Sequence, residues 1–175
     1  MILKLVIQNS KLIISVFTAI LVLVIVWVVF GSHSNIIQPI EYNHKIHIEV
    51  AELSCIDCHT NVENMPRATI PNIESCQDCH SDEPISESPE EEKLLKYISK
   101  GNRIPWERIY KVPDHVYFSH QRHVTIGELE CSLCHGYVED MIKPASYPVW
   151  TPTMDNCIDC HKQHNVTNDC LACHR

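Results

Sequence analysis

The chain contains five copies of the pattern Cys-x-x-Cys-His, and these copies use all ten of its cysteines. Two thiols separated by two residues can each bond one vinyl group of a porphyrin, while the next histidine binds the porphyrin iron. Each copy therefore predicts one covalently bound haem c. The cysteines expected to attach haem are Cys55, Cys58, Cys76, Cys79, Cys131, Cys134, Cys157, Cys160, Cys170 and Cys173. The expected proximal iron ligands are His59, His80, His135, His161 and His174.

Zinc sites and redox-active dithiols or disulfides also use Cys-x-x-Cys, so the cysteine pairs alone do not identify a cofactor. Neither alternative requires a histidine directly after the second cysteine. Because a histidine follows every one of the five pairs, we favour five haem c groups over zinc or disulfides.

An internal duplication organises the motifs. An aromatic-x-His-x-x-His segment occurs at residues 42–47 and again at 118–123, each time seven residues before a Cys-x-x-Cys-His motif. A second motif then closes each copy. The repeated unit is therefore a dihaem module, and the fifth motif follows the second module.

The duplication and the hydropathy pattern together predict the organisation of the chain. We expect a single N-terminal transmembrane helix and a haem-packed domain like that of class III cytochromes c, with short helices, loops and little or no sheet. The predicted segments are a membrane anchor (1–31), dihaem module one (41–80), a linker with a short helix ending before Gly101 (81–112), dihaem module two (113–161) and a fifth-haem segment (162–175).

The His-x-x-His pairs are candidate distal ligands. His44 and His47 are three residues apart, so on a helical turn both imidazoles leave the same face. They cannot both bind one iron, because the proximal histidine already fills its opposite axial position. We therefore expect each pair, His44 with His47 and His120 with His123, to serve two haems. The duplication favours histidine pairs that bind the haems of their own module. Binding of a haem in the other module stays an open alternative.

The fifth haem needs a distal ligand from elsewhere. His164, between the fourth and fifth motifs, is the first choice, and His115 is the reserve. His33 is expected at a membrane boundary rather than on iron.

Three methionines offer a further possibility. Met65, Met141 and Met154 are possible axial sulfur ligands, which would raise a haem potential. Methionine also packs against porphyrin faces, and this second role is the more common one.

Residues 12–30 form an uncharged run of 19 residues, about the length that crosses a bilayer as a helix. A cleaved signal peptide is the alternative, but the run is long for one and no Ala-x-Ala site follows. Lys4 and Lys11 precede the run, which places the N-terminus in the cytoplasm. We expect a bacterial inner-membrane protein with a single span and its haem domain in the periplasm, where haem-loaded cysteine pairs belong.

Residues 31–175 carry 12 basic and 22 acidic residues, a formal balance of −10. Haem propionates would add further negative charge. Because nucleic-acid binding depends on basic surfaces, we expect no nucleic-acid partner.

Residues 104–123 (IPWERIYKVPDHVYFSHQRH), followed by Cys131-Ser132-Leu133-Cys134-His135-Gly136, resemble two related groups of membrane-anchored multihaem cytochromes. These are the subunits of alternative complex III and of the quinone reductase complex of sulfate reducers. Pro152-Thr153-Met154 fits the same pattern, and the resemblance covers roughly residues 31–175. Five haems with one anchor look like the alternative complex III form.

The resemblance implies haems held between two histidines and a subunit that is not itself an enzyme. It implies partners: an iron–sulfur protein, polytopic quinol-binding subunits, and a monohaem or soluble cytochrome c or a terminal oxidase as acceptor. In alternative complex III the subunit collects electrons from a quinol-oxidising partner. In the sulfate-reducer relatives, electrons flow the opposite way, from a periplasmic cytochrome toward quinone. With both axial positions filled, the irons would transfer single electrons rather than activate substrates.

Two alternatives remain open. One is a small multihaem reductase, which would need a haem without a distal ligand. The other is a stand-alone membrane-tethered quinol dehydrogenase, which would need its own quinol site.

Overall fold

The computed structural model describes residues 2–30 and 35–174, and the chain divides into two compact units, residues 1–35 and 36–175. The first unit contains α1 (Ile2–Phe30), in which residues 13–27 are all exposed. Over the part of the chain that the structure describes, no helix has the length and hydropathy needed to cross a membrane. The predicted transmembrane role of residues 12–30 is therefore not supported here. His33 lies outside the described residues.

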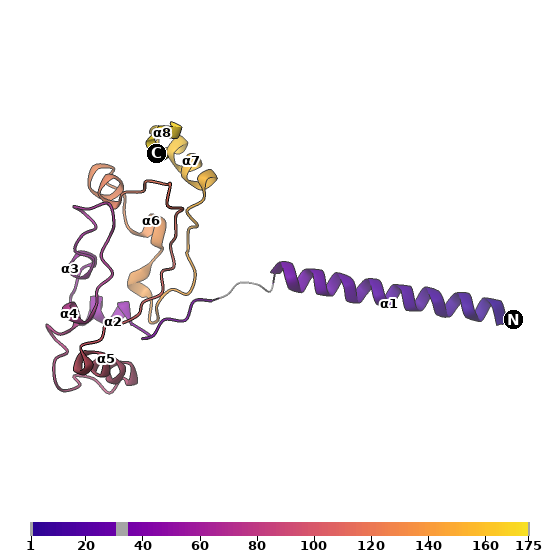
Figure 1. The fold of residues 1–175 in the computed structure, drawn as a ribbon, viewed down its shortest axis with the longest axis horizontal. Coiled ribbons are helices and arrows are strands. Elements are labelled where there is room, and N and C mark those ends of the chain that lie inside the picture. The colour runs from indigo at the N-terminus through magenta and orange to yellow at the C-terminus, as the bar shows by residue number, and fades with distance from the viewer. Residues whose placement is uncertain (1, 31–34, 175) are drawn as a thin grey trace. The chain divides into compact units, whose positions relative to one another are not determined.

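The second unit is built from short helices joined by long irregular segments (Figure 1). Within residues 36–174 the helices are α2 (His44–Glu49), α3 (Cys55–Cys58), α4 (Ile73–Cys76), α5 (Pro89–Lys100), the π-helical η1 (Arg122–Ile126), α6 (Ser132–His135), the 3₁₀-helical η2 (Val138–Asp140), α7 (Met154–Gln163) and α8 (Cys170–Cys173). Apart from one isolated bridge between Val116 and His174, the described residues form no β-pairing. The prediction of short helices and loops without a sheet is confirmed.

The predicted short helix before Gly101 is also confirmed, as α5. Ser88 caps its N-terminus by accepting a hydrogen bond from the Glu90 N–H at 3.3 Å, and Pro89 occupies the first turn, where no N–H partner is needed. Gly101 ends the helix with φ of 62°, a left-handed conformation that favours glycine.

The apolar core of this unit is small and lies around α4 and α5. Ile40, Ile73, Leu94 and Ile104 form one buried cluster. Asn72 ties the cluster together, because its side chain donates to the Ile104 carbonyl at 3.0 Å and accepts from the Ile104 N–H at 2.8 Å. In Figure 1, α5 lies at one end of the unit and α7 and α8 at the other.

Module two has no comparable cluster. Among the described residues, none between 116 and 174 is buried. A segment of this size without buried side chains does not hide enough apolar surface to offset the entropy of ordering it.

The two modules dock reciprocally through their backbones. The Lys45 N–H donates to the Met141 carbonyl at 3.1 Å, and the Gln121 N–H donates to the Met65 carbonyl at 3.3 Å. These are equivalent positions of the duplication. Each His-x-x-His turn therefore rests on the loop that follows the first motif of the other module.

Candidate functional site

The Cys-x-x-Cys-His motifs lie on short helical turns, most of which begin at a capping side chain. The Thr153 hydroxyl accepts from the Asn156 N–H at 3.2 Å at the start of α7, and the Asp169 carboxylate accepts from the Leu171 N–H at 3.0 Å at the start of α8. The Asn72 amide caps α4 in the same way. Caps of this kind fix where a short turn begins, and each motif has its thiols and imidazole at the first, fourth and fifth positions of Cys-x-x-Cys-His.

The aromatic residue of each repeat contacts both imidazoles of its His-x-x-His pair. The Tyr42 ring stacks on His47 at 4.4 Å between centroids and meets the edge of His44 at 4.7 Å. In module two, Phe118 makes the same two contacts, with His123 at 4.6 Å and His120 at 4.9 Å. One aromatic ring therefore sets two imidazoles at different angles, as ligation of two separate irons requires.

Backbone carbonyls fix which ring nitrogen faces outward. The His47 Nδ1 donates to the Asn43 carbonyl at 2.8 Å, and the His123 Nδ1 donates to the Ser119 carbonyl at 2.7 Å. With Nδ1 protonated and bonded, Nε2 carries the free lone pair. That nitrogen is the one available to a metal.

Motif histidines and turn histidines face each other at a recurring distance. The ring centroids are 6.3 Å apart for His47 and His80, 6.4 Å for His120 and His135, and 6.1 Å for His123 and His161. A first-row metal lies about 2 Å from an imidazole nitrogen, and the ring centre about 1 Å further back, so one metal between two histidines holds their centroids roughly 6 Å apart. The observed gaps have the width of one iron with its two ligand bonds.

His44 lies near His59, the histidine of the remaining motif in module one. Burial, with smaller contributions from the neighbouring His59 and His47, lowers the pKa of His44 to about 4. Its Nδ1 is the one buried side-chain N or O atom without a hydrogen-bond partner among the described residues. A neutral imidazole with an unused nitrogen is in the form that binds a metal.

The fifth motif faces His115. The His115 and His174 rings stack with centroids 5.5 Å apart. The backbone fixes this arrangement, because the Tyr117 N–H donates to the Cys173 carbonyl at 2.8 Å and Val116 bridges to His174. His164 caps the C-terminal end of α7 and, like His115, is exposed. The structure thus brings the reserve ligand, rather than the first choice, to the fifth motif.

The cysteine thiols order the five motifs into a row. Burial is the largest cause of the raised pKa values of four thiols, and a thiol of another motif is the next largest. These neighbouring thiols are Cys76 with Cys58, Cys131 with Cys55, Cys134 with Cys160, and Cys157 with Cys173. The order along the row is therefore 76–80, 55–59, 131–135, 157–161 and 170–174.

The thiols with raised pKa values differ from those of a reactive dithiol. All ten cysteines are free, and burial raises the pKa of Cys76 to about 11. A redox-active Cys-x-x-Cys instead lowers the pKa of its reactive thiol. The described residues also contain no cluster of three or more His, Cys, Asp or Glu arranged to hold a metal ion. Paired imidazoles beside unpaired thiols fit haem c better than zinc or a dithiol.

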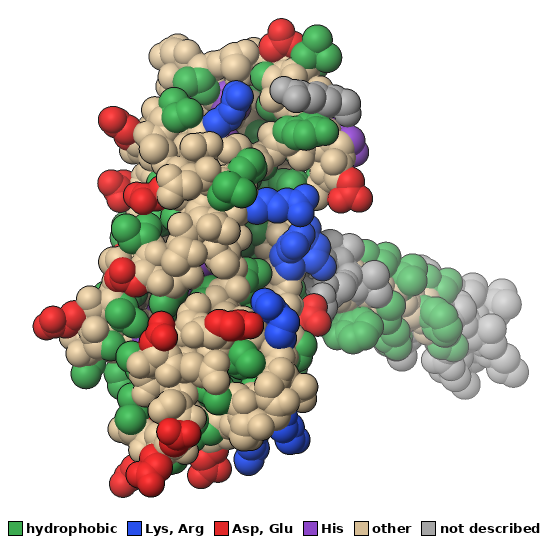
Figure 2. Space-filling model, turned by 60° about the vertical axis from the view of Figure 1, so that its left-hand side comes forward, with side chains coloured by type: hydrophobic (Ala, Val, Ile, Leu, Met, Phe, Trp, Pro, Cys, Tyr) green, Lys and Arg blue, Asp and Glu red, His purple; other side chains and the backbone are tan. Residues whose placement is uncertain are grey.

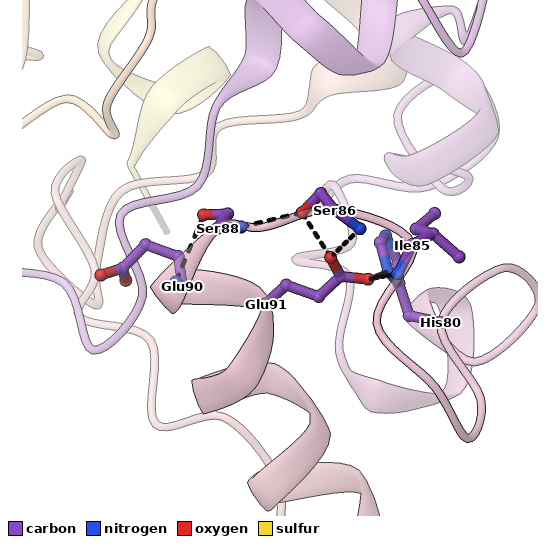
Figure 3. Close-up of polar contacts among 6 residues, drawn as sticks. All are labelled: His80, Ile85, Ser86, Ser88, Glu90 and Glu91. Carbon is purple, nitrogen blue, oxygen red and sulfur yellow. Dashed lines mark hydrogen bonds and ion pairs between the residues drawn. The ribbon is translucent and has the colours of Figure 1, made fainter.

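The proximal histidines differ in what their second nitrogen contacts. His59 Nδ1 donates to the Thr69 carbonyl at 2.7 Å, and His161 Nδ1 donates to the Thr167 carbonyl at 2.6 Å. His80 Nδ1 instead donates to the Glu91 carboxylate at 2.7 Å (Figure 3).

Glu91 is a buried carboxylate with several donors. Its side chain is 4% exposed. It accepts from the Ile85 N–H at 2.9 Å, from the Ser86 N–H at 2.8 Å and from the Ser86 hydroxyl. Burial tends to raise the pKa of Glu91, but these hydrogen bonds together lower it to about 2. Glu91 is therefore an anion beside the His80 imidazole.

Sequence reasoning missed Glu91 and the roles of Tyr42 and Phe118. Glu91 belongs to the acidic stretch taken for a solvated linker, and its neighbours Glu90 and Glu92 are chemically identical. A capping-box pattern, Ser88 followed by Glu91 three residues later, was the available signal, although Glu91 bonds to other groups here. The aromatic positions were visible as part of the repeat.

The surface is mainly acidic, as expected from the composition. On the face in Figure 2, acidic side chains are spread widely, Lys and Arg gather along one side, and histidine shows only small areas. Most histidines of residues 36–174 are partly buried, whereas His115 and His164 are exposed. Of the methionines considered as ligands, Met65 and Met154 are exposed at 51% and 63%.

Comparisons with known proteins agree with this site. Residues 40–94 match the family model described as cytochrome c7 and related cytochrome c. Over 162 aligned residues the chain is 34% identical to the menaquinone reductase, multiheme cytochrome c subunit of Nitratidesulfovibrio vulgaris (strain Hildenborough), covering 79% of this chain and 77% of that relative. Membership of this family implies covalently bound haem c and a role in electron transfer. The chain belongs to the multihaem cytochrome c family.

Proposed function

We propose that the chain binds five haem c groups and conducts electrons along them as a subunit of a quinone-linked membrane complex. The observation that carries the proposal is the recurring gap of about 6 Å between a motif histidine and a turn histidine. The same gap in both modules is what a chain of irons with two axial histidines requires.

The chain's own residues would give such a row its properties. Haem iron, when bound, supplies one-electron chemistry. His47, His120 and His123, with His44 and His115 at the other two motifs, would fill the distal positions and leave no open site for a substrate. Burial lowers the pKa of His44, His120 and His135, so these imidazoles stay neutral and able to bind metal at pH 7.

The test of haem number and ligation uses the whole protein. We expect the intact mass to exceed the polypeptide mass by five haems and the reduced protein to bind no carbon monoxide. Fewer than five haems would contradict the count. Carbon monoxide binding by the native protein would favour the small multihaem reductase.

Two directions of electron flow are supported by different observations. Five motifs with one expected anchor resemble the alternative complex III form, which favours electrons leaving quinol. The similarity to a menaquinone reductase subunit favours electrons moving toward quinone. We propose the quinol-oxidising direction, and we expect a purified native complex to reduce a soluble cytochrome c when given a menaquinol analogue. If the complex instead only reduces the quinone, using a reduced periplasmic cytochrome as donor, electrons flow toward quinone.

The proposed partners are an iron–sulfur subunit and polytopic quinol-binding subunits, with a monohaem or soluble cytochrome c or a terminal oxidase as acceptor. Purification in mild detergent should recover the iron–sulfur subunit and the polytopic subunits together with this chain. Recovery of this chain alone, with quinol dehydrogenase activity, would support the stand-alone alternative.

The proposed location is the periplasmic side of the bacterial inner membrane. The uncharged run at residues 12–30 and the exposed apolar side chains of α1 support a membrane tether. In spheroplasts, the intact haem domain should stay with the membrane fraction. Protease added from outside should cleave it. Protection from the protease, or release into the soluble fraction without cleavage, would contradict this location.

A further inference from the structure

The second motif of module one, residues 76–80, differs in its surroundings from the motifs of His59 and His161. The His80 imidazole donates to a buried carboxylate, whereas His59 and His161 donate to backbone carbonyls. His161 occupies the equivalent position in module two. The difference therefore lies outside the repeat and needs its own explanation.

A carboxylate is a stronger acceptor than a carbonyl. A hydrogen bond from Nδ1 to an anion shifts electron density onto the imidazole and makes Nε2 a more basic metal ligand. A more basic ligand stabilises ferric over ferrous iron. The nearby negative charge acts in the same direction, and it is weakly screened because the side chain is only 4% exposed.

We propose that Glu91 is a positioning residue that orients the proximal His80 and lowers the reduction potential of the haem at residues 76–80. This inference rests on the proposed function, because it requires a haem at that motif. It gives the row a low-potential site at the end that α5 covers.

The hydrogen-bond donors around Glu91 set how strongly its negative charge acts on His80. Ser86 contributes an N–H and a hydroxyl to the carboxylate, and Ile85 contributes an N–H. Each donor takes up part of the negative charge that would otherwise act on His80. Removing the Ser86 hydroxyl should therefore strengthen the effect of Glu91, whereas removing the charge of Glu91 should abolish it. The two substitutions predict shifts of opposite sign.

The experiment is a potentiometric titration of the five-haem protein followed by visible and electron paramagnetic resonance spectra. In Glu91→Gln we expect the reduction equilibrium constant of one haem to rise about tenfold, which is about 59 mV for one electron. In Ser86→Ala the same haem should become harder to reduce. The low-spin resonance of that haem alone should change, since only its ligand field is altered.

Glu90→Gln is the matched control. Glu90 adjoins Glu91 but accepts hydrogen bonds from the Lys93 ammonium at 2.7 Å and from the Glu41 N–H at 2.7 Å rather than from an imidazole. The same chemical change there should leave all five potentials in place.

The outcomes separate this inference from the function on which it depends. A wild-type protein with fewer than five haems contradicts the proposed function. Five haems with unmoved potentials in Glu91→Gln contradict the role of Glu91 alone. If Glu91→Gln loses its haem, Ser86→Ala decides: a lower potential supports the role, and an unchanged or higher potential overturns it.

Discussion

The two dihaem modules share their ligand geometry but differ in what supports it. In both, one aromatic ring holds two distal imidazoles, which face motif histidines. Module one adds a buried apolar cluster and a carboxylate behind one proximal ligand. Module two has neither among its described residues, and its equivalent ligand donates to a carbonyl.

The source of this difference is the segment between the modules. Leu94, Ile104 and Glu91 all lie in residues 81–112, which the sequence suggested was a linker. Trp106 in the same segment donates its indole N–H to the Pro71 carbonyl at 2.9 Å. The repeat thus positions the ligands, while a segment outside the repeat stabilises one copy and alters its electrostatics.

The largest expected effect comes from removing one haem from each module in turn. Cys157→Ala with Cys160→Ala should lower Tm by about 10 °C or more, and by more than Cys76→Ala with Cys79→Ala, because module two lacks a buried cluster. Differential scanning calorimetry measures Tm, and intact mass verifies the loss of one haem. Equal shifts would show that the cluster of module one contributes little.

The next effect concerns the fifth motif, which extends module two. His115→Ala should leave one iron open, so the reduced protein should bind one carbon monoxide. His164→Ala is the matched control and should bind none. The opposite result would return the distal role to His164.

A smaller effect is expected in the cluster of module one. Leu94→Ala should lower the free energy of unfolding by about 2–4 kcal/mol, because it opens a cavity beside Ile40, Ile73 and Ile104. Urea titration measures this change. Leu171, which is 77% exposed in module two's extension, serves as the control, and Leu171→Ala should change stability by less than about 0.5 kcal/mol. A loss of under about 1 kcal/mol for Leu94→Ala would contradict a supporting core.

The smallest effect is expected for the ion pair between the Lys143 ammonium and the Glu41 carboxylate, 2.8 Å apart. Both side chains are at least half exposed, so Lys143→Ala should lower stability only slightly, and 1 M salt should reduce that loss. Denaturant titration at two salt concentrations checks this. A large loss that salt leaves unchanged would mean that this ion pair, rather than the backbone contacts, holds the modules together.

The sequence predicted the parts of the site that repeat. The motifs, the His-x-x-His turns and the helix before Gly101 follow local rules of spacing and capping, so they could be found without coordinates. The contact of His115 with His174 depends on a backbone bridge between residues far apart in the chain. Proximity along the sequence pointed to His164 instead.

Glu91 shows a second limit of sequence reasoning. Three consecutive glutamates begin α5, and only the turn of the helix decides which of them is buried. A run of acids is usually a solvated surface, and here that rule holds for Glu92 but not for Glu91. Burial at such a position depends on the loop at Ile85 and Ser86, which supplies the donors.

The reciprocal docking of the modules has a consequence for biosynthesis. A ribosome makes the chain from its N-terminus, so the Lys45 N–H has no partner carbonyl until Met141 has been synthesised. Until then the two halves cannot dock through these backbone bonds. The reciprocal contacts between the modules therefore form only in the later part of synthesis, once both His-x-x-His turns and both loops exist.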